Sequence, residues 1–173
     1  MEIDVQGVVH TASTTSLSPD PNEVIPQVIA AVIGLLKSAA NTPSIKSFVF
    51  TSSSMAADDG VPSQTVSIDS SSWNDAMITE AWKITSAPFP PTHGFVVYGA
   101  SKAAAERALW KFVEEQKPSF KVNAILPDAN FGSVLSEQGS KSTGAWMGMV
   151  LAEGVGFTKH LPKRGFSPFP QLA

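Results

Sequence analysis

Short apolar runs and helical apolar patterns alternate along the chain up to Leu126. Residues 3–10, 47–51 and 120–126 carry compact apolar runs, which favours buried strands. Apolar side chains recur at helical spacing between Val24 and Ala39, and again in the segment 98–116. The pattern predicts strand, helix, strand, helix, strand, an order that builds a parallel sheet with right-handed crossovers.

Turn and cap residues mark the ends of these elements. Asn22 is expected to cap the first helix, and Asn41-Thr42-Pro43 is expected to stop it. Residues 55–95 are rich in Asp, Ser and Pro, which predicts an irregular excursion with one short helix around residues 73–84. A further short helix is expected at residues 144–151. An excursion of this length inside a compact unit is usually functional.

Composition and charge narrow the class of protein. The 173 residues are 43% hydrophobic and 16% charged, which fits one folded domain. The net charge of −3, without a long basic run, argues against a nucleic-acid partner. The chain has no cysteine and its three histidines are far apart in sequence, so we predict no metal site. Because we find no signal peptide and no apolar run long enough for a bilayer, we expect a cytoplasmic protein without a membrane partner.

Small polar residues follow each predicted strand. They are Thr11-Ala12-Ser13, then the segment from Thr51 to Ser54, then Pro127-Asp128. Ligands of parallel α/β sheets sit beyond the carboxyl ends of the strands, so these segments predict a site. His10 ends a strand with apolar neighbours and is expected to be a core residue. His93 is expected at the surface of a proline-rich loop.

Tyr98, the only tyrosine, stands four residues before Lys102 at the expected start of a helix. Positions i and i+4 share a helix face, so the ammonium can lower the pKa of the phenol and let it protonate an alkoxide. A serine hydroxyl can hold the substrate oxygen, while a nicotinamide must supply the hydride. The alternative is a packed tyrosine beside a solvated lysine, because Tyr-x-x-x-Lys alone is common by chance.

Several motifs in one order resemble the extended short-chain dehydrogenase/reductase family. They include Gly7-Val-Val-His-Thr-Ala-Ser13, Phe48-Val-Phe-Thr-Ser-Ser-Ser54, Val97-Tyr-Gly-Ala-Ser-Lys102 and Val122-Asn-Ala-Ile-Leu-Pro127. The chain looks most similar to fungal NADPH-dependent aldehyde and ketone reductases, relatives of the dihydroflavonol reductases. This resemblance implies an α/β fold: a partial Rossmann fold, that is, part of a doubly wound parallel sheet.

The resemblance also implies roles for single residues. Tyr98 matches the proton donor, and Lys102 the lysine that binds the nicotinamide ribose. Ser53 matches the catalytic serine, with Ser54 as its rival and a substrate contact. Trp146 matches an aromatic residue of the substrate pocket, and packing within its helix is an equal alternative. The implied cofactor contacts, besides Tyr98 and Lys102, are Thr11, Ala12, Ser13, Thr51, Ser52, Pro127, Asp128 and Ala129.

The chain departs from the family in its missing glycine-rich turn. That turn binds the cofactor's pyrophosphate at a helix N-terminus, so we expect weakened binding of NADPH, with NADH left open as well. We therefore expect a truncated chain: residues 1–155 as a partial NAD(P)-binding domain and residues 156–173 as an irregular, basic, proline-rich tail. The strand at residues 3–10 would be left as an open edge, which favours self-association.

Three functions follow from these features. The first is NADPH-dependent reduction of a small-molecule aldehyde or ketone. The second is an inactive fragment that binds no cofactor and, at most, contacts another protein through its open edge. The third is a nucleotide-sugar epimerase or dehydratase of the same family. Ser54-Met55 counts against a dehydratase, because an Asp-Glu pair usually stands there.

Overall fold

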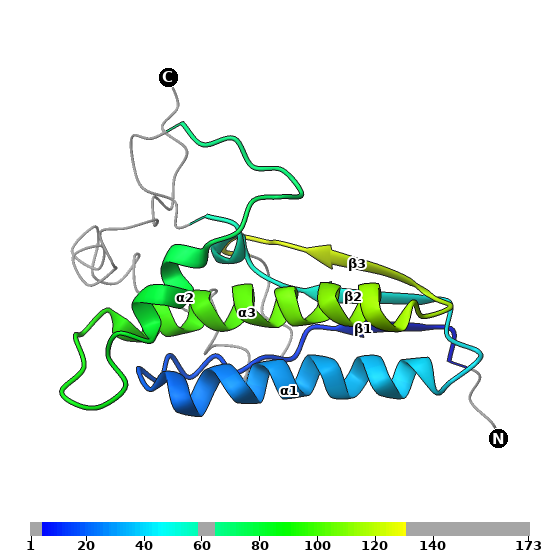
Figure 1. Ribbon diagram of the computed structural model, residues 1–173, viewed down its shortest axis with the longest axis horizontal. Helices are drawn as coiled ribbons and strands as arrows, with labels where there is room; N and C mark the ends of the chain where they lie inside the picture. The colour runs from blue at the N-terminus through cyan, green and yellow to red at the C-terminus, as the bar shows by residue number, and fades with distance from the viewer. Residues whose placement is uncertain (1–4, 59–64, 131–173) are drawn as a thin grey trace.

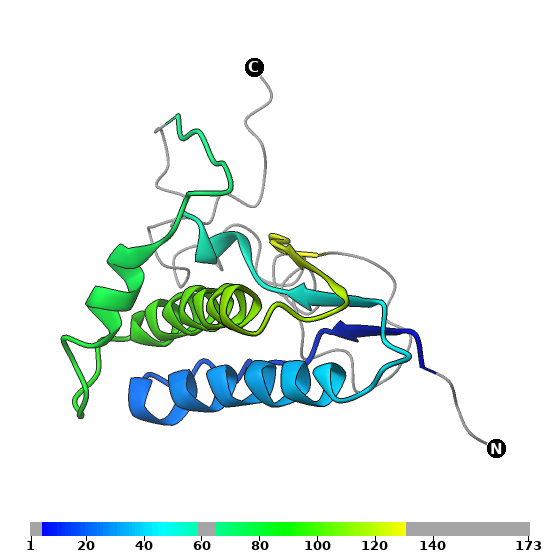
Figure 2. The same cartoon turned by 45° about the vertical axis from the view of Figure 1, so that its right-hand side comes forward.

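The computed structural model describes residues 5–58 and 65–130. In this part of the chain three parallel strands form one sheet in the order β1-β2-β3. The arrowheads of β1 and β2 point toward the end of the molecule where η1 and α2 lie (Figure 2). The elements are β1 (Gly7–His10), α1 (Pro21–Ala40), β2 (Ser47–Thr51), the 3-10 turn η1 (Ser54–Ala56), α2 (Asp75–Ala81), α3 (His93–Gln116) and β3 (Lys121–Ile125). The predicted alternation of strands and long helices is confirmed.

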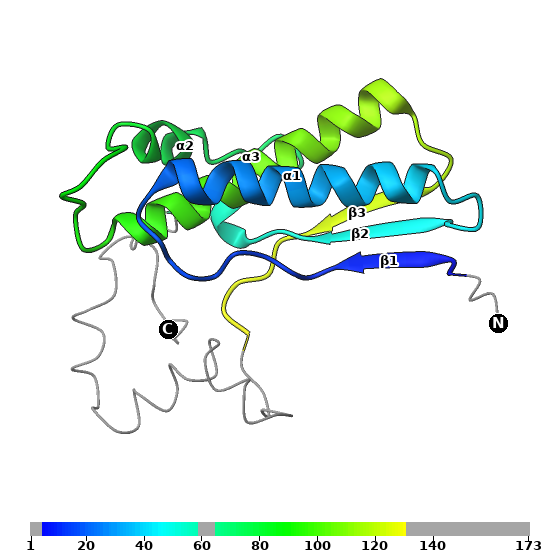
Figure 3. The same ribbon diagram turned by 90° about the horizontal axis from the view of Figure 1, so that it is seen from below.

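Helices α1 and α3 lie side by side along one face of the sheet (Figures 1 and 3). The core between these layers contains Phe48 and Phe50 from β2, Leu36 from α1, and Val97 and Leu109 from α3. Side chains of β2 alternate between buried and half-buried, as expected for a strand with one face in a core. Burying these large apolar side chains supplies most of the driving force that fixes α3 on the sheet.

Helix α1 begins at Pro21, one residue before the expected cap. Asp20 is the N-cap, because its Oδ1 accepts a hydrogen bond of 2.9 Å from the backbone N–H of Asn22. Pro21 occupies the first helical position, where a missing N–H costs nothing. Asn22 therefore lies inside the helix, which corrects the prediction. The predicted stop at Asn41 is confirmed, since α1 ends at Ala40.

Helix α1 also revises the expectation about membrane spans. It has 20 residues with a mean hydropathy of 1.5, so it is long and apolar enough to cross a bilayer by length and composition alone. A core helix passes the same test, and α1 packs Val28, Val32 and Leu36 into the core. We therefore treat it as a packing helix of the α/β layer.

Helix α3 begins at His93, five residues earlier than the sequence suggested, so Tyr98 lies in its second turn. His93 is buried, stacks on Phe89 with ring centroids 5.8 Å apart, and has its Nε2 3.2 Å from the carbonyl oxygen of Ile84. The expectation of a surface histidine was wrong because the proline-rich loop folds back onto this helix turn. Between β2 and α3, the short helix α2 confirms the helix expected around residues 73–84.

Some expectations concern residues outside the described ranges. They are the helix at residues 144–151, the side chain of Trp146 and the tail at residues 156–173. These remain predictions.

Candidate functional site

The ends of β2 and β3 stay together beyond the sheet. The backbone N–H of Ser52 donates to the carbonyl oxygen of Ile125 at 2.8 Å, and that of Ser54 donates to the carbonyl oxygen of Pro127 at 2.9 Å. These bonds bring the serine segment after β2 against Pro127, as the sequence predicted from the parallel order. The carboxyl end of β1 lies alongside, because His10 pairs with Phe50 in the sheet register.

Ser53 and Tyr98 meet at this end of the sheet. The Ser53 side chain lies close enough to the Tyr98 phenol to affect the pKa of that phenol, and Ser53 is buried. Ser53 is also the N-cap of η1: its Oγ accepts a hydrogen bond of 3.3 Å from the backbone N–H of Met55. The backbone of η1 therefore holds this hydroxyl in place beside the phenol. This contact favours Ser53 over Ser54, which is the first residue of η1.

Burial raises the pKa of Tyr98 above its ordinary value, and the hydrogen bond from Ser53 opposes part of that rise. The expectation that Lys102 would lower this pKa is therefore wrong for the protein without a ligand. The ammonium lies 5.9 Å from the centre of the Tyr98 ring, and its charge does not overcome the loss of hydration. Tyr98 is consequently protonated at neutral pH, the form that a proton donor requires.

Lys102 lies one helix turn after Tyr98 and is only 3% exposed. Its Nζ donates a hydrogen bond of 3.0 Å to the carbonyl oxygen of Thr51 and stands 5.6 Å from the centre of the Phe50 ring. Burial lowers its pKa to about 8, so the ammonium is charged at neutral pH and loses its proton readily above that value. An ammonium has three N–H donors, so donors remain for a ligand beyond the one that Thr51 uses.

Residues on η1 and α2 pack against the turn that holds Tyr98. A Cβ added at Gly99 would overlap the Sδ of Met77 and lie 3.2 Å from the Cε of Met55. The hydroxyl of Ser101, which is fully buried, donates a 2.7 Å hydrogen bond to the carbonyl oxygen of Tyr98. The glycine thus allows two methionine side chains to approach α3 beside the tyrosine. Neither methionine was singled out from the sequence, because nothing in its local pattern marks it.

Three buried hydroxyls at the strand ends have no hydrogen-bond partner among the described residues. They belong to Ser13, Thr51 and Ser52. A buried polar group without a partner is costly, and ribose hydroxyls or phosphate oxygens of a dinucleotide could satisfy it. Together with the free donors of Lys102, these hydroxyls fit the polar edge of a nicotinamide cofactor. All three were predicted as cofactor contacts, and that role remains a prediction.

The other predicted cofactor contacts lie at the same end of the sheet. Thr11 and Ala12 follow β1 and are exposed, whereas Ala129 is half-buried. Asp128 accepts a hydrogen bond of 2.8 Å from the backbone N–H of Ala129 through its own Oδ1. The structure thus gathers the three strand-end segments, while it leaves the substrate residue Trp146 outside the described ranges.

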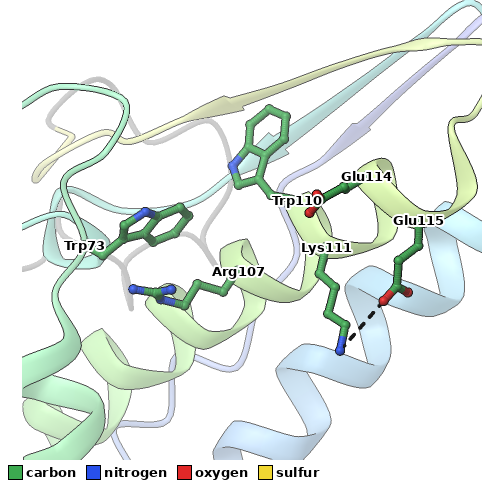
Figure 4. Close-up of a pocket in the computed structure, with 6 residues that line it drawn as sticks. All are labelled: Trp73, Arg107, Trp110, Lys111, Glu114 and Glu115. Carbon is green, nitrogen blue, oxygen red and sulfur yellow. Dashed lines mark ion pairs between the residues drawn. The ribbon is translucent and has the colours of Figure 1, made fainter.

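A separate groove of about 690 Å³ runs along the C-terminal half of α3 (Figure 4). In it the guanidinium of Arg107 stacks on Trp73 at 4.6 Å and pairs with Asp75 at 2.7 Å. The indole N–H of Trp110 donates a hydrogen bond of 3.3 Å to Glu106. Trp73 and Trp110 are both half-buried. The groove is lined by Trp73, Arg107, Trp110, Lys111, Glu114 and Glu115, and none of the predicted site residues is among them.

The sequence is similar to known NAD-binding proteins over most of its length. The family model described as male sterility protein matches residues 2–156. An NAD-dependent epimerase/dehydratase of Aspergillus terreus is 38% identical over 163 residues, which are 94% of this chain and 45% of that protein. Aldehyde reductase 2 of Sporidiobolus salmonicolor is 40% identical over 143 residues, which are 82% of this chain and 41% of that protein.

The fold is similar to that of solved reductases. The yeast methylglyoxal/isovaleraldehyde reductase, solved in complex with NADPH, superposes with a TM-score of 0.62 at 26% sequence identity. The match covers 78% of this chain and 39% of that one. The described α/β fold is thus part of a Rossmann-like NAD-binding fold, and the chain spans less than half the length of these relatives.

Proposed function

Because the chain belongs to the extended short-chain dehydrogenase/reductases, the NAD-binding family of the male sterility protein, we propose that it reduces an aldehyde or ketone with NADPH. The observation that carries this proposal is that Ser53, Tyr98 and the buried ammonium of Lys102 lie together at the carboxyl end of the sheet, with the ammonium 5.9 Å from the centre of the Tyr98 ring. The similarity to an aldehyde reductase supports the choice of a carbonyl substrate.

Each of the three side chains has one part in the proposed reaction. Tyr98 gives its phenolic proton to the carbonyl oxygen as the carbon is reduced. Ser53 donates a hydrogen bond to the same oxygen and holds it beside the phenol. The ammonium of Lys102 stabilises the phenolate that remains and donates to ribose hydroxyls. NADPH, when bound, supplies the hydride.

The proposal also assigns cofactor and substrate contacts to the neighbouring residues. Thr11, Ser13, Thr51 and Ser52 contact the cofactor through backbone or hydroxyl groups. The backbone from Pro127 to Ala129 contacts the carboxamide, with Asp128 between them. On the substrate side, Ser54 and Trp146 line the pocket. These contacts are proposed because the residues occupy the matching positions of the family motifs. For the described residues, their place at the strand ends supports the same assignment.

The test of this function is NADPH oxidation in the presence of a simple aldehyde, at millimolar cofactor concentration. We expect Tyr98→Phe to lower the rate by about 10²-fold or more, since general acid catalysis contributes at least that factor. Ser53→Ala is expected to lower it more than Ser54→Ala does. Equal rates for the wild-type protein and a correctly folded Tyr98→Phe variant would contradict the proposal.

An epimerase or dehydratase activity is the second candidate, because the Aspergillus terreus relative carries that name. An epimerase of this family also uses a tyrosine and a lysine, but it returns the hydride and consumes no net NADPH. Incubation with a nucleotide sugar and NAD would therefore produce an epimer without a change in absorbance at the cofactor band. Net NADPH oxidation with an aldehyde favours the reductase.

A further inference from the structure

Three buried side chains form a continuous row beneath the proposed site. His10 is the last residue of β1, Phe50 lies opposite it on β2, and Lys102 comes from α3. The centroids of the His10 and Phe50 rings are 5.8 Å apart at an interplanar angle of 35°. The Nζ of Lys102 is 5.6 Å from the centroid of the same Phe50 ring. Phe50 is therefore in contact with the imidazole and faces the ammonium.

The charge of Lys102 reaches His10 across this row. Burial lowers the pKa of His10 below its ordinary value, and the positive charge of Lys102 lowers it further. On the surrounding described elements, α3 brings Tyr98 to this region and carries the buried Glu106 one turn after Lys102, and β2 has no titratable side chain. On α1, Glu23 and Lys37 are exposed, as is Lys121 at the far end of β3. Among these groups, Lys102 is the one whose charge lowers the pKa of His10.

We propose that His10 is a positioning residue whose neutral imidazole supports the Phe50 ring beneath the Lys102 ammonium, and whose protonation repels that ammonium from the Thr51 carbonyl. Two positive charges in a water-poor interior repel one another more strongly than they would in water. The neutral imidazole also leaves the face of Phe50 free to attract the ammonium. The protonation state of His10 thereby determines the position of the Lys102 ammonium.

The catalytic consequence of this coupling rests on the proposed function, but the coupling itself does not. It is a property of the chain without cofactor, so it can be measured without turnover. A protein that failed to reduce aldehydes would leave the coupling between His10 and Lys102 intact. A protein with active reductase chemistry and no coupling would contradict the role of His10 alone.

The first measurement is an NMR pH titration of the His10 imidazole. We expect its pKa to rise in Lys102→Met, because the positive charge is removed while a long apolar side chain still fills the site. In the control Lys111→Met, which changes an exposed lysine on the same helix, the pKa of His10 should stay at the wild-type value. The same His10 pKa in wild type and Lys102→Met would overturn the proposal. Lys102→Gln serves as the second neutral variant if Lys102→Met does not fold.

The second measurement follows the Lys102 side chain itself. In wild type, its ε-carbon resonance should change across the pH range in which His10 titrates, as the ammonium moves away from Thr51. In His10→Gln, which is neutral at every pH, that step should disappear. A merely structural role for His10 would alter the resonance position but leave the pH step. Persistence of the step in His10→Gln would therefore contradict the proposal.

Discussion

Single residues at the end of the sheet combine burial with polar chemistry. Among them, Ser53, Lys102 and His10 are buried. Ser53 interacts with Tyr98, Lys102 donates a hydrogen bond to the carbonyl oxygen of Thr51, and His10 belongs to the sheet. The cost of keeping Lys102 charged is visible in its pKa, which is lowered to about 8 from 10.5. Polar groups buried at such cost are often retained for function rather than stability.

The sequence predicted this set in part. The spacing of Tyr98 and Lys102 and the serines after β2 placed these side chains at one end of the sheet, and the structure brings them together. The direction of the Tyr98 pKa was wrong, because burial raises it and the burial of a helix residue depends on tertiary packing that the local sequence does not show. His10 was correctly expected in the core, but its link to Lys102 depends on a sheet register that no local pattern shows.

We predict that Lys102→Met stabilises the protein at pH 7. A shift of the Lys102 pKa from 10.5 to about 8 corresponds to about 3 kcal/mol of lost stability. Lys102→Met removes this penalty but also loses the hydrogen bond to Thr51, which offsets about 1 kcal/mol of the gain. The expected net increase in the free energy of unfolding is roughly 1–2 kcal/mol. Urea unfolding at pH 7 measures it.

The pH dependence provides the check on this prediction. Because the pKa of Lys102 is depressed in the folded protein, the unfolded chain binds more protons than the folded one between about pH 8 and 10.5. The stability of the wild type therefore rises relative to that of Lys102→Met as the pH increases through this range. The advantage of Lys102→Met should therefore shrink by pH 10. Lys111→Met, which removes an exposed lysine, should change stability by less than about 0.5 kcal/mol. A gain that stayed constant up to pH 10 would show that the ammonium was not its cause.

For the helices and strands, the spacing of apolar residues predicted which segments form them more reliably than it predicted where they begin and end. The strand at residues 47–51 and the end of α3 at Gln116 agree with the expectation. The start of α3 was missed because Gly94 and three following apolar residues look like a loop leading into a strand. A contact distant in sequence accompanies this start: Gly94 lies directly against the backbone of Leu17, in the segment after β1.

Two glycine substitutions in different helices should have opposite effects. A Cβ at Gly94 would overlap the carbonyl oxygen of Leu17, a backbone atom whose residue has a φ of 53°. Gly94→Ala should therefore destabilise the protein by roughly 1–3 kcal/mol. Gly34 on α1 has no neighbouring atom within 4 Å, so Gly34→Ala should stabilise by about 0.5–1 kcal/mol through helix propensity.

Thermal unfolding of the two glycine variants measures both effects under one condition. The pair shares the same chemical change, and the difference between them isolates the close approach of α3 to the segment after β1. If both variants were stabilised, the described contact between Gly94 and Leu17 would be wrong.

At the scale of the whole molecule, the sheet is covered on one face in the described residues, while Val9 and Ile125 are 66% and 49% exposed. The chain spans less than half the length of its relatives. Its ionisable groups make stability depend on pH in both directions. Because the pKa values of His10 and Lys102 are depressed, these two groups make the folded state more stable as the pH rises. The raised pKa of Tyr98 makes the folded state less stable as the pH rises above 10.

We predict that wild-type stability falls on acidification below pH 6.5 faster than that of His10→Gln. The folded pKa of His10 is depressed, so protonation of the unfolded chain below its ordinary value of 6.5 favours unfolding. Melting temperatures of both proteins between pH 7 and pH 5 give the comparison. The difference between them should change steadily in favour of His10→Gln as the pH falls. Parallel curves would mean that His10 titrates normally in the folded protein.

A fluorescence titration with NADPH of wild type, Lys102→Met and Lys111→Met tests the nicotinamide site itself. We expect saturable binding by wild type and wild-type affinity for Lys111→Met. For Lys102→Met we expect binding weaker by about tenfold or more, because charge-assisted hydrogen bonds are lost. Absence of saturable binding by wild type, or equal affinities for wild type and Lys102→Met, would contradict a nicotinamide site at Ser53, Tyr98 and Lys102.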